Sequence, residues 1–376
     1  MERRRVGILG ATGMVGQRFI QLLHNHPWFE IAWLAASDRS AGKTYAEACR
    51  WKLDTPLPPK IAAMMLMPNV PEGTPTGELP KIIFAALDSD VAYELEPKFA
   101  AAGCAVISNS SAFRMTTDVP LVVPEVNADH LELIEQQSWR KESGGYIVTN
   151  PNCCAIGLVM ALKPLEERFG IDRLFVSTMQ AISGAGYPGV ASLDILGNVI
   201  PFIKNEEEKL QEECGKLLGS LAGDHIQMVD AKLSAHCNRV AVEDGHTECV
   251  SIKLKEPATY EQVLAAWSEF RPLAGIHEGQ PLPSAPDLPV EYEDAIDRPQ
   301  PRLDRMRGKG MAATVGRLRP CTLFDWKFVV LSHNTIRGAA GAAVLNAEIL
   351  AMLGKLDFKR WAESSEQAKR VPAGIA

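Results

Sequence analysis

The sequence contains no hydrophobic run that approaches the roughly 20 apolar residues of a membrane-spanning helix. It also has no excess of positive charge, because 39 Lys and Arg face 46 Asp and Glu and give a formal net charge of -7. A basic surface for nucleic acid or anionic lipid is therefore not expected. The eight cysteines form no CxxC pair and no Cys/His spacing of the zinc type. We expect a reduced, cytoplasmic protein without a metal site.

The length of 376 residues exceeds what one ordinary hydrophobic core organises, so we expect two domains. In the first, short apolar strands alternate with helical segments, as in a parallel doubly wound sheet. Later strands are longer and predict an antiparallel or mixed sheet; they are placed at 174–180, 227–231, 239–242 and 248–253. The proline-rich segment 281–301 is interpreted as a loop or interface arm, and the apolar helix 342–354 is expected to pack back on the first domain.

A glycine loop follows the first predicted strand. Val6-Gly7-Ile8-Leu9 is a short apolar strand, and Gly10-Ala11-Thr12-Gly13-Met14-Val15-Gly16 leads from it into a helical pattern at Gln17. The three glycines of the loop let the backbone turn tightly and approach a pyrophosphate, whose charge is met by the helix N-terminal amides. The GxxGxxG spacing is a variant of GxGxxG, but its place between strand and helix predicts a dinucleotide-binding loop.

The end of the second predicted strand indicates which dinucleotide binds. The strand 31–36 is followed by Ser37-Asp38-Arg39-Ser40-Ala41-Gly42-Lys43, where the adenosine ribose lies in such a fold. An arginine suits the 2′-phosphate of NADP, and a lone carboxylate suits NAD. Ser37, Arg39 and Ser40 therefore favour NADP, whereas the carboxylate of Asp38 favours NAD.

The segment Asn150-Pro151-Asn152-Cys153-Cys154 offers a nucleophile. Most cysteines of a reduced protein are small buried hydrophobes, so a reactive one needs support. The apolar run 155–162 predicts a buried helix that begins at Cys153, and a helix N-terminus lowers a thiol pKa. A thiolate that meets a nicotinamide is the chemistry of an aldehyde or acyl-phosphate dehydrogenase, because a covalent thioester accepts a hydride.

Three polar residues follow predicted strands or turns in the second half of the chain. His246 stands where a turn meets a strand and is a natural proton partner for a thiol. Arg239, seven residues earlier, suits a bidentate grip on a carboxylate. Gln180 supplies an amide at a strand end, before a glycine-rich loop.

Charged residues elsewhere suit a zwitterionic substrate that carries a phosphate. Glu206 and Lys209 are one helical turn apart and share a face, although a run of this kind is more often a solvated charged helix. Asn109 ends the predicted strand 105–109 and Arg114 follows it, and the two offer an amide and a guanidinium to a phosphate.

Together these motifs resemble the aspartate-semialdehyde dehydrogenase family, and the match runs from the GATGMVG loop to Ser332-His333-Asn334-Thr335-Ile336-Arg337-Gly338-Ala339-Ala340-Gly341. The residues of these motifs are most similar to those of the branch found in archaea and fungi. The resemblance implies an α/β protein in which an N-terminal Rossmann doubly wound domain is joined to an α+β, glyceraldehyde-3-phosphate-dehydrogenase-like catalytic and dimerisation domain. We place the first domain at 1–152, completed by the C-terminal helix of 335–376, and the second at 153–334. Homodimers or homotetramers that associate through the sheet of the second domain are expected.

The resemblance also implies a role for each candidate. It implies Cys153 as nucleophile, His246 as acid/base, Gln180 for positioning the substrate, Arg239 for its carboxylate, Glu206 for its amino group, and Lys209, Arg114 and Asn109 for the phosphate. The contacts implied for NADP are Gly10, Thr12, Gly13, Met14, Val15, Ser37, Arg39, Ser40 and Asn334.

Two positions depart from the family pattern. Cys154 stands where Ser or Thr is usual, and Ala241 stands where Pro is usual. Adjacent thiols can also oxidise, so Cys154 leaves open which thiol is labelled first. We choose Cys153 because it directly follows Pro151 and Asn152.

The expected activity is NADPH-dependent reduction of L-aspartyl 4-phosphate to L-aspartate 4-semialdehyde, with release of inorganic phosphate, on the route to lysine, threonine, methionine and isoleucine. Malonyl-CoA reductase of the same family and, more distantly, acetylglutamyl-phosphate reductase stay open. Malonyl-CoA lacks an amino group and a phosphate leaving group, so Glu206 and Arg114 would have little to bind. A catalytically silent, nucleotide-binding regulatory paralogue is the alternative of another class.

Overall fold

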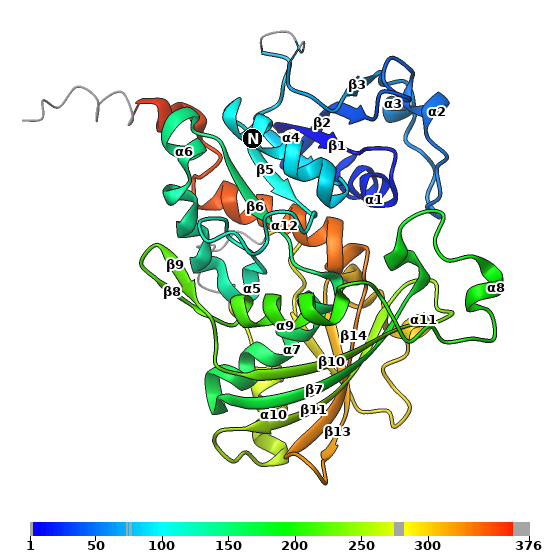
Figure 1. The fold of residues 1–376 in the computed structure, drawn as a ribbon, viewed down its shortest axis with the longest axis vertical. Coiled ribbons are helices and arrows are strands. Elements are labelled where there is room, and N and C mark those ends of the chain that lie inside the picture. Colours follow the sequence, from blue (N-terminus) through cyan, green and yellow to red (C-terminus); the bar gives the residue numbers. More distant parts are fainter. Residues whose placement is uncertain (1–2, 73, 75–76, 274–281, 364–376) are drawn as a thin grey trace, which may run out of the picture.

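The chain is organised around two separate β-sheets, one above the other in Figure 1. The structure, a computed structural model, describes residues 3–72, 74, 77–273 and 282–363. Within them, each of these two sheets has six strands, and a small two-stranded sheet is formed by β8 (Ser220–Ala222) and β9 (His225–Gln227). No helix of this described part is both long and apolar enough to cross a membrane.

The first sheet is parallel throughout and has the strand order β3-β2-β1-β4-β5-β6. Its strands are β1 (Arg4–Leu9), β2 (Phe29–Ala36), β3 (Leu66–Pro68), β4 (Ile82–Ala85), β5 (Ala105–Ser108) and β6 (Tyr146–Thr149). The order reverses direction between β1 and β4, and ligands of doubly wound sheets bind at such a reversal. The predicted Rossmann-like domain is confirmed.

Helices cover both faces of this sheet. The long ones are α1 (Met14–Leu23), α4 (Ser89–Ala101) and α12 (Gly341–Met352). Shorter segments are α2 (Tyr45–Ala48), α3 (Pro59–Ala62), α5 (Pro124–Asn127), η1 (Ala128–Gln136) and α6 (Ser138–Ser143). The apolar helix α12 is almost wholly buried and shares one core with α1 and the sheet, so the expected return of the chain to the first sheet is seen.

The second sheet is mixed, with the order β10-β7-β11-β14-β13-β12. Its strands are β7 (Ile171–Gln180), β10 (Lys232–Arg239), β11 (His246–Leu254), β12 (Val290–Glu293), β13 (Ala313–Pro320) and β14 (Trp326–Ser332). The helices and turns between them are η2 (Ile182–Ala185), α8 (Ser192–Ile195), α9 (Glu206–Leu217), α10 (Tyr260–Ser268), α11 (Pro301–Asp304) and η3 (Arg307–Gly310). After β14, η4 (Ile336–Ala340) leads into α12.

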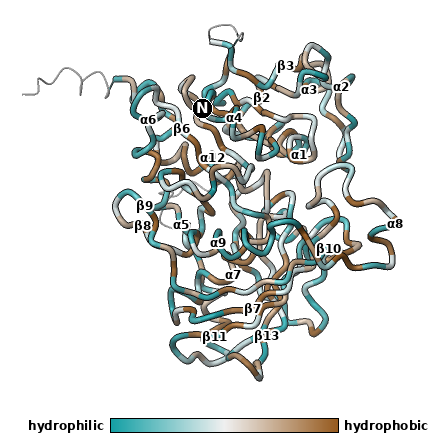
Figure 2. The backbone as a smooth tube through the Cα atoms, in the orientation of Figure 1, coloured by the Kyte–Doolittle hydropathy of each residue, from teal (hydrophilic) through white to brown (hydrophobic). Residues whose placement is uncertain are grey.

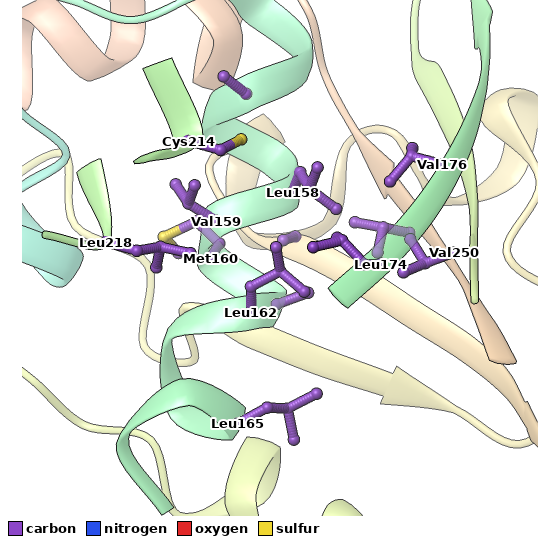
Figure 3. Packing of buried hydrophobic residues seen from close by; sticks show 14 of the residues in the cluster. Leu158, Val159, Met160, Leu162, Leu165, Leu174, Val176, Cys214, Leu218 and Val250 are labelled. Carbon is purple, nitrogen blue, oxygen red and sulfur yellow. The ribbon is translucent and has the colours of Figure 1, made fainter. Parts of the chain in front are cut away.

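The helix α7 (Cys153–Phe169) packs on the second sheet and begins four residues after the last strand of the first. Leu158 and Leu162 of this helix lie against Leu174, Val176 and Val250 of the strands (Figure 3). Because this face of α7 is apolar along its length, burial fixes the helix against the sheet and thereby fixes where its first residue lies.

Three predicted segments of the second half were wrong in detail. The predicted strands 227–231 and 239–242 are replaced by one strand, β10, between them. In β10 the exposed residues Lys232, Ser234 and His236 alternate with more buried neighbours. The sequence of β10 is therefore less apolar than the valine-containing segment 239–242 that was predicted as a strand. The segment 281–301, predicted to be loop only, contains β12, whose Val290 is in the core; residue 281 itself lies outside the described residues.

Hydrophobic stretches run through the strands of both sheets and through α7 (Figure 2). The arm that carries α8 protrudes at the edge of the same view and is also partly hydrophobic. Along this arm Leu193, Leu196 and Phe202 are exposed by 92%, 66% and 69%. Such exposed apolar side chains are unusual in an isolated globular protein.

Candidate active site

A cavity of about 530 Å³ is lined by residues of both sheets. The segments that follow β4 and β5 reach it from the first sheet, and the last residues of β7 and β10 reach it from the second. The start of α7 lies between them and brings Cys153 into the cavity lining. Cys153, Gln180 and the predicted substrate-binding residues all line this cavity, whereas His246 is not part of the lining and contacts Cys153.

Cys153 is the first residue of α7, as predicted. The preceding Asn152 caps the helix, because its Oδ1 accepts hydrogen bonds from the amides of Cys154 at 2.8 Å and Ala155 at 3.2 Å. Asn152 also donates through Nδ2 to Glu206 and through its backbone N–H to the Glu213 carboxylate. The start of α7, and with it the Cys153 side chain, is therefore held both by the helix cap and by the two carboxylates of α9.

His246 is the first residue of β11 and is fully buried beside the thiol. Its Nε2 lies 3.1 Å from Cys153 Sγ, and its Nδ1 lies 3.1 Å from the backbone N of Ala181. A backbone N–H can only donate, so Nδ1 is the acceptor and the proton of the neutral ring belongs on Nε2. The imidazole therefore directs an N–H toward the sulfur.

The Cys153 thiol is electrostatically prepared to ionise. Its side-chain contact with Cys154, together with His246 and the nearby Arg239 guanidinium, holds the pKa of Cys153 well below the ordinary range of a thiol. These groups outweigh the opposing effect of burial. A thiolate is the reactive form of cysteine, so this is the environment of a nucleophile.

Gln180, Arg239 and Glu206 form a buried polar cluster at the ends of neighbouring elements. Gln180 and Arg239 are the last residues of β7 and β10 and lie opposite each other in the parallel register of those strands. Gln180 Nε2 donates to Glu206 Oε1 at 3.0 Å, and Arg239 donates to the carbonyl of Ala181 at 2.9 Å. All three side chains line the cavity, so a carboxylate acceptor and a guanidinium face the same space.

The residues predicted for a phosphate also line the cavity. Arg114 donates to Glu213 at 2.9 Å and to the carbonyl of Asn109 at 2.8 Å, which fixes its guanidinium. Asn109 follows β5, and Lys209 follows Glu206 by one turn of α9. The cations of Arg114 and Lys209 therefore face the cavity beside Asn109, as an anionic group of a ligand requires.

The predicted cofactor residues fall into two groups. Met14, Val15 and Asn334 line the cavity, and Asn334 is fixed by hydrogen bonds with Gly245 and Ser183. The residues Gly10, Thr12, Gly13, Ser37, Arg39 and Ser40 are not part of the lining of this cavity. They belong to the turn after β1, which faces the pyrophosphate of a dinucleotide in this fold, and to the exposed turn after β2, which faces its adenosine end.

The glycine turn after β1 fits a dinucleotide pyrophosphate. Gly10 has a φ of +70°, and a Cβ there would come within 2.2 Å of the Ala86 carbonyl oxygen. Gly13 is the N-cap of α1 and offers no side chain to its first amides, so those N–H groups are available to an anion.

Several residues of the site were not identified as site residues from the sequence. Glu213 carries no distinguishing pattern, because it stands in the charged run of α9. Gly338 belongs to the motif that ends the resemblance, and a Cβ there would lie 2.8 Å from Cys153 Cβ. Asn152 had a usable signal, since a polar residue just before a predicted helix is a capping candidate.

Comparison with known proteins gives consistent results over most of the chain. Residues 5–134 match the family model of the semialdehyde dehydrogenase NAD binding domain, and residues 162–337 match that of the semialdehyde dehydrogenase dimerisation domain. The aspartate-semialdehyde dehydrogenase of Archaeoglobus fulgidus is 50% identical over 348 residues, which cover 93% of this chain and 98% of that protein. The Saccharomyces cerevisiae enzyme of the same name is 47% identical over 365 residues, with 93% and 98% coverage.

A solved structure shows the same architecture. The crystal structure of aspartate semialdehyde dehydrogenase with NADP from Candida albicans matches with a TM-score of 0.83 at 45% identity. The match covers 93% of this chain and 99% of that one.

Proposed function

The chain belongs to the aspartate-semialdehyde dehydrogenase family, and from this premise we propose which of its residues carry out the reaction of that family. The protein is an NADP-dependent oxidoreductase of amino-acid biosynthesis that converts L-aspartyl 4-phosphate to L-aspartate 4-semialdehyde. The observation that supports the residue assignment best is the 3.1 Å contact between His246 Nε2 and Cys153 Sγ. Cys153 lines the cavity together with cationic groups and Glu206.

In the proposed first step, the Cys153 thiolate attacks C4 of the acyl phosphate. An S–C bond forms, and the C–O bond to the phosphate breaks as phosphate leaves with its electron pair. NADPH, when bound, supplies the hydride that reduces the resulting thioester. Hydride addition leaves an oxyanion on this carbon, and as the oxyanion collapses to the aldehyde C=O the C–S bond breaks, its electron pair returns to sulfur, and the aldehyde is released.

His246 is proposed to stabilise the negative charge on the Cys153 sulfur through a hydrogen bond. Its Nε2–H faces the sulfur, so it stabilises the thiolate before attack and again when the C–S bond breaks. The oxyanion that develops at the same carbon is proposed to accept a hydrogen bond from the Cys153 amide, because the next two amides of α7 already donate to Asn152. The dipole of α7 favours negative charge at this end of the helix. The Ala181 amide keeps the imidazole oriented throughout.

The remaining residues are proposed to bind and orient the substrate. Arg239 takes the substrate carboxylate, and Glu206 takes the ammonium group in exchange for some of its bonds to Gln180 and Asn152. Gln180 positions the reacting carbonyl. Lys209, Arg114 and Asn109 take the phosphate, and Arg114 is already oriented for this by Glu213.

NADP is proposed to span from the cavity to the turn after β2. The amides at the start of α1 suit the pyrophosphate, with Gly10, Thr12, Gly13, Met14 and Val15 along the turn. Ser37, Arg39 and Ser40 suit the 2′-phosphate, and Asn334 is proposed to lie near the nicotinamide.

We also propose finer properties of the whole protein. Domain boundaries at 1–152 with 335–376 and at 153–334 are supported by the end of β6 at Thr149 and by the packing of α12 on the first sheet. The chain contains a dimerisation domain, so a homodimer is the proposed assembly and a pair of such dimers is the tetrameric alternative. A cytoplasmic location is supported by the eight free thiols, and the net charge of -7 disfavours nucleic-acid and membrane partners.

The decisive experiment follows NADP reduction in the reverse direction. Wild type and Cys153→Ala are assayed with L-aspartate semialdehyde and phosphate, and in parallel with malonate semialdehyde and coenzyme A. We expect phosphate-dependent activity with the aspartyl substrate only, and its loss in Cys153→Ala. Activity only with malonate semialdehyde and coenzyme A would replace the proposal by a thioester reductase.

Glu206→Gln is the matched specificity variant. It keeps the size of the side chain and removes the charge proposed to meet the substrate ammonium. It is expected to impair aspartyl turnover strongly while NADP binding is retained. Unchanged aspartyl turnover in this variant would contradict the role given to Glu206.

A further inference from the structure

Two asparagines stand at the same level on neighbouring strands of the first sheet. Asn109 directly follows β5, and Asn150 directly follows β6. The strands are parallel and pair Ser108 with Thr149, so the next residue of each strand lies beside the other. Asn109 lines the cavity, whereas Asn150 is 1% exposed and has no part in the mechanism above. The pair lies at the carboxyl edge of the sheet, where ligands of this fold bind.

The Asn150 side chain makes hydrogen bonds through each of its polar groups. Its Nδ2 donates to the backbone carbonyl of Ala339 at 2.7 Å and to Asn109 Oδ1 at 2.9 Å. Its Oδ1 accepts from Nδ2 of Asn346, on α12, at 2.6 Å. A side-chain amide has two N–H donors, and both are used here within the protein. Asn150 therefore supports other residues and has no donor left for a ligand.

Backbone carbonyls determine which way these amides face. The Ala339 carbonyl oxygen can only accept, so the Asn150 atom beside it is the nitrogen. The nitrogen of Asn346 faces the carbonyl of Val122 at 3.4 Å as well as Asn150 Oδ1. The second N–H of Asn150 then points to Asn109, and the atom of Asn109 that accepts it is the side-chain oxygen. The orientation is thus passed from the backbone through Asn150 to a residue of the cavity.

The Asn109 amide consequently turns its NH2 group away from Asn150. Within the described part of the chain, this nitrogen donates to the carbonyl of Ala85 at 3.4 Å, which is long for a hydrogen bond. The guanidinium of Arg114 donates to the backbone carbonyl of Asn109 and lines the same cavity. The oxygens of a phosphate accept hydrogen bonds, so an amide favours phosphate with its NH2 group and disfavours it with its oxygen.

We propose that Asn150 is a positioning residue that holds the Asn109 amide with its NH2 group toward the phosphate, and that Asn346 of α12 holds Asn150 in turn. The proposal rests on the role in phosphate binding given to Asn109 in the proposed function. Asn150 itself touches neither the substrate nor the cofactor.

The test is the phosphate dependence of NADP reduction by the full-length protein with L-aspartate semialdehyde. In Asn150→Asp an oxygen replaces the NH2 group at nearly the same size. The acid is either ionised or gives its one proton to the Ala339 carbonyl, so it has no donor for Asn109 in either state. The Asn109 amide is then expected to turn its oxygen toward the cavity. The KM for phosphate is expected to rise about tenfold, with the KM values for L-aspartate semialdehyde and NADP within about twofold of wild type.

Asn150→Ala separates orientation from packing. It removes the donor but leaves Asn109 free to turn either way, so the KM for phosphate is expected to rise by only about threefold. An unchanged KM for phosphate in Asn150→Asp, or a larger rise in Asn150→Ala than in Asn150→Asp, overturns the proposal. If Asn150→Asp does not fold, an unchanged KM for phosphate in Asn150→Ala overturns it equally.

Asn127→Asp is the matched control for placing an acid at a buried amide. Asn127 of α5 is buried, donates to the carbonyl of Leu121 and accepts from the amide of Val123, and it is not part of the cavity lining. Asn127→Asp is expected to lower thermal stability and to leave the KM for phosphate unchanged. An equal rise of this KM in Asn127→Asp would show a general loss of structure and would overturn the proposal.

Asn109→Ala separates this proposal from the proposed function. It is expected to raise the KM for phosphate itself, and adding Asn150→Asp to it is expected to raise that KM no further, because Asn150 acts through Asn109. Absence of phosphate-dependent activity in the wild type defeats the proposed function. An unchanged KM in Asn109→Ala defeats the role of Asn109 and this inference with it. A raised KM in Asn109→Ala with an unchanged one in Asn150→Asp defeats only the inference about Asn150.

Discussion

Asn152 shows at the scale of one residue what could and could not be predicted from the sequence. Its place before an apolar run is the pattern of a helix cap, and it caps α7 through Oδ1. Its bonds to Glu206 and Glu213 join it to α9, more than fifty residues later in the chain. No local pattern reports such a contact, because it depends on how two helices pack.

The same distinction applies to Cys153 and His246. Each residue type and its position at an element end could be predicted, since strand and helix boundaries follow local patterns. The tautomer of His246 could not, because it is set by the amide of Ala181, which directly follows β7.

Glu96 gives a stability prediction at this scale. It is buried on α4, accepts a 2.6 Å hydrogen bond from Ser108, and burial raises the pKa of its carboxyl to about 7. Between the unfolded value of 4.5 and about 7 the folded state binds more protons, so this group costs stability as pH rises through that window. Glu96→Gln is therefore expected to stabilise the protein at pH 8 by about 1–3 kcal/mol and to have little effect near pH 4.

Thermal unfolding of Glu96→Gln at the two pH values checks this. The exposed Glu94 lies on the same helix, and Glu94→Gln is the matched control that should leave stability unchanged. Equal stabilisation of Glu96→Gln at both pH values would show that the effect does not come from the proton.

At the scale of elements, the short π-helix η4 connects β14 to α12 and brings Gly338 against Cys153. Its Arg337 is fully buried and makes a bidentate ion pair with Glu125 of α5, at 2.8 and 2.6 Å. Such a pair adds little net stability over an apolar replacement, but removal of one partner leaves a buried charge uncompensated. The pair therefore fixes the position of η4 more than it increases stability.

A double-mutant cycle tests this account of η4. Glu125→Gln alone is expected to destabilise the protein by about 3–5 kcal/mol, and Arg337→Met combined with it is expected to recover much of that loss. Glu30→Gln, which removes an exposed partner of Lys60, should cost less than about 1 kcal/mol and serves as the control. Additive losses in the double variant would contradict the coupling.

The strands of the second sheet mark the limit of prediction for elements. β7 and β11 were predicted because their buried faces are apolar, whereas β10 was misplaced because its outward residues are Lys, Ser and His. β12 was missed because its four residues stand in a proline-rich segment. In both cases pairing with a neighbouring strand, and not the local pattern, determines the structure.

At the scale of the whole molecule, the outer face of the second sheet carries side chains that are only partly buried in one chain. Phe175 and Met179 of β7 are half-buried there, and Cys249 of β11 is exposed. Since the chain contains a dimerisation domain, we expect a second copy to cover this face. The native mass should be twice the 41.0 kDa of the chain.

Light scattering checks the mass, and maleimide labelling checks the interface. Cys249 should react much more slowly at concentrations where the dimer persists than after dilution into monomer. Phe175→Asp is expected to favour the monomer and to restore fast labelling of Cys249. Fast labelling in the intact dimer would place the interface elsewhere.

The packing of α12 on the first sheet has a consequence for biosynthesis of the chain. The sheet is complete in sequence by Thr149, but the apolar helix that shares its core spans Gly341–Met352. During translation the first half therefore emerges from the ribosome with part of its core open to solvent until almost the entire second half has been made. Because α12 arrives last, the Rossmann-like half is finished last although it is synthesised first, and an early stop in the message would leave it exposed to chaperones and proteases.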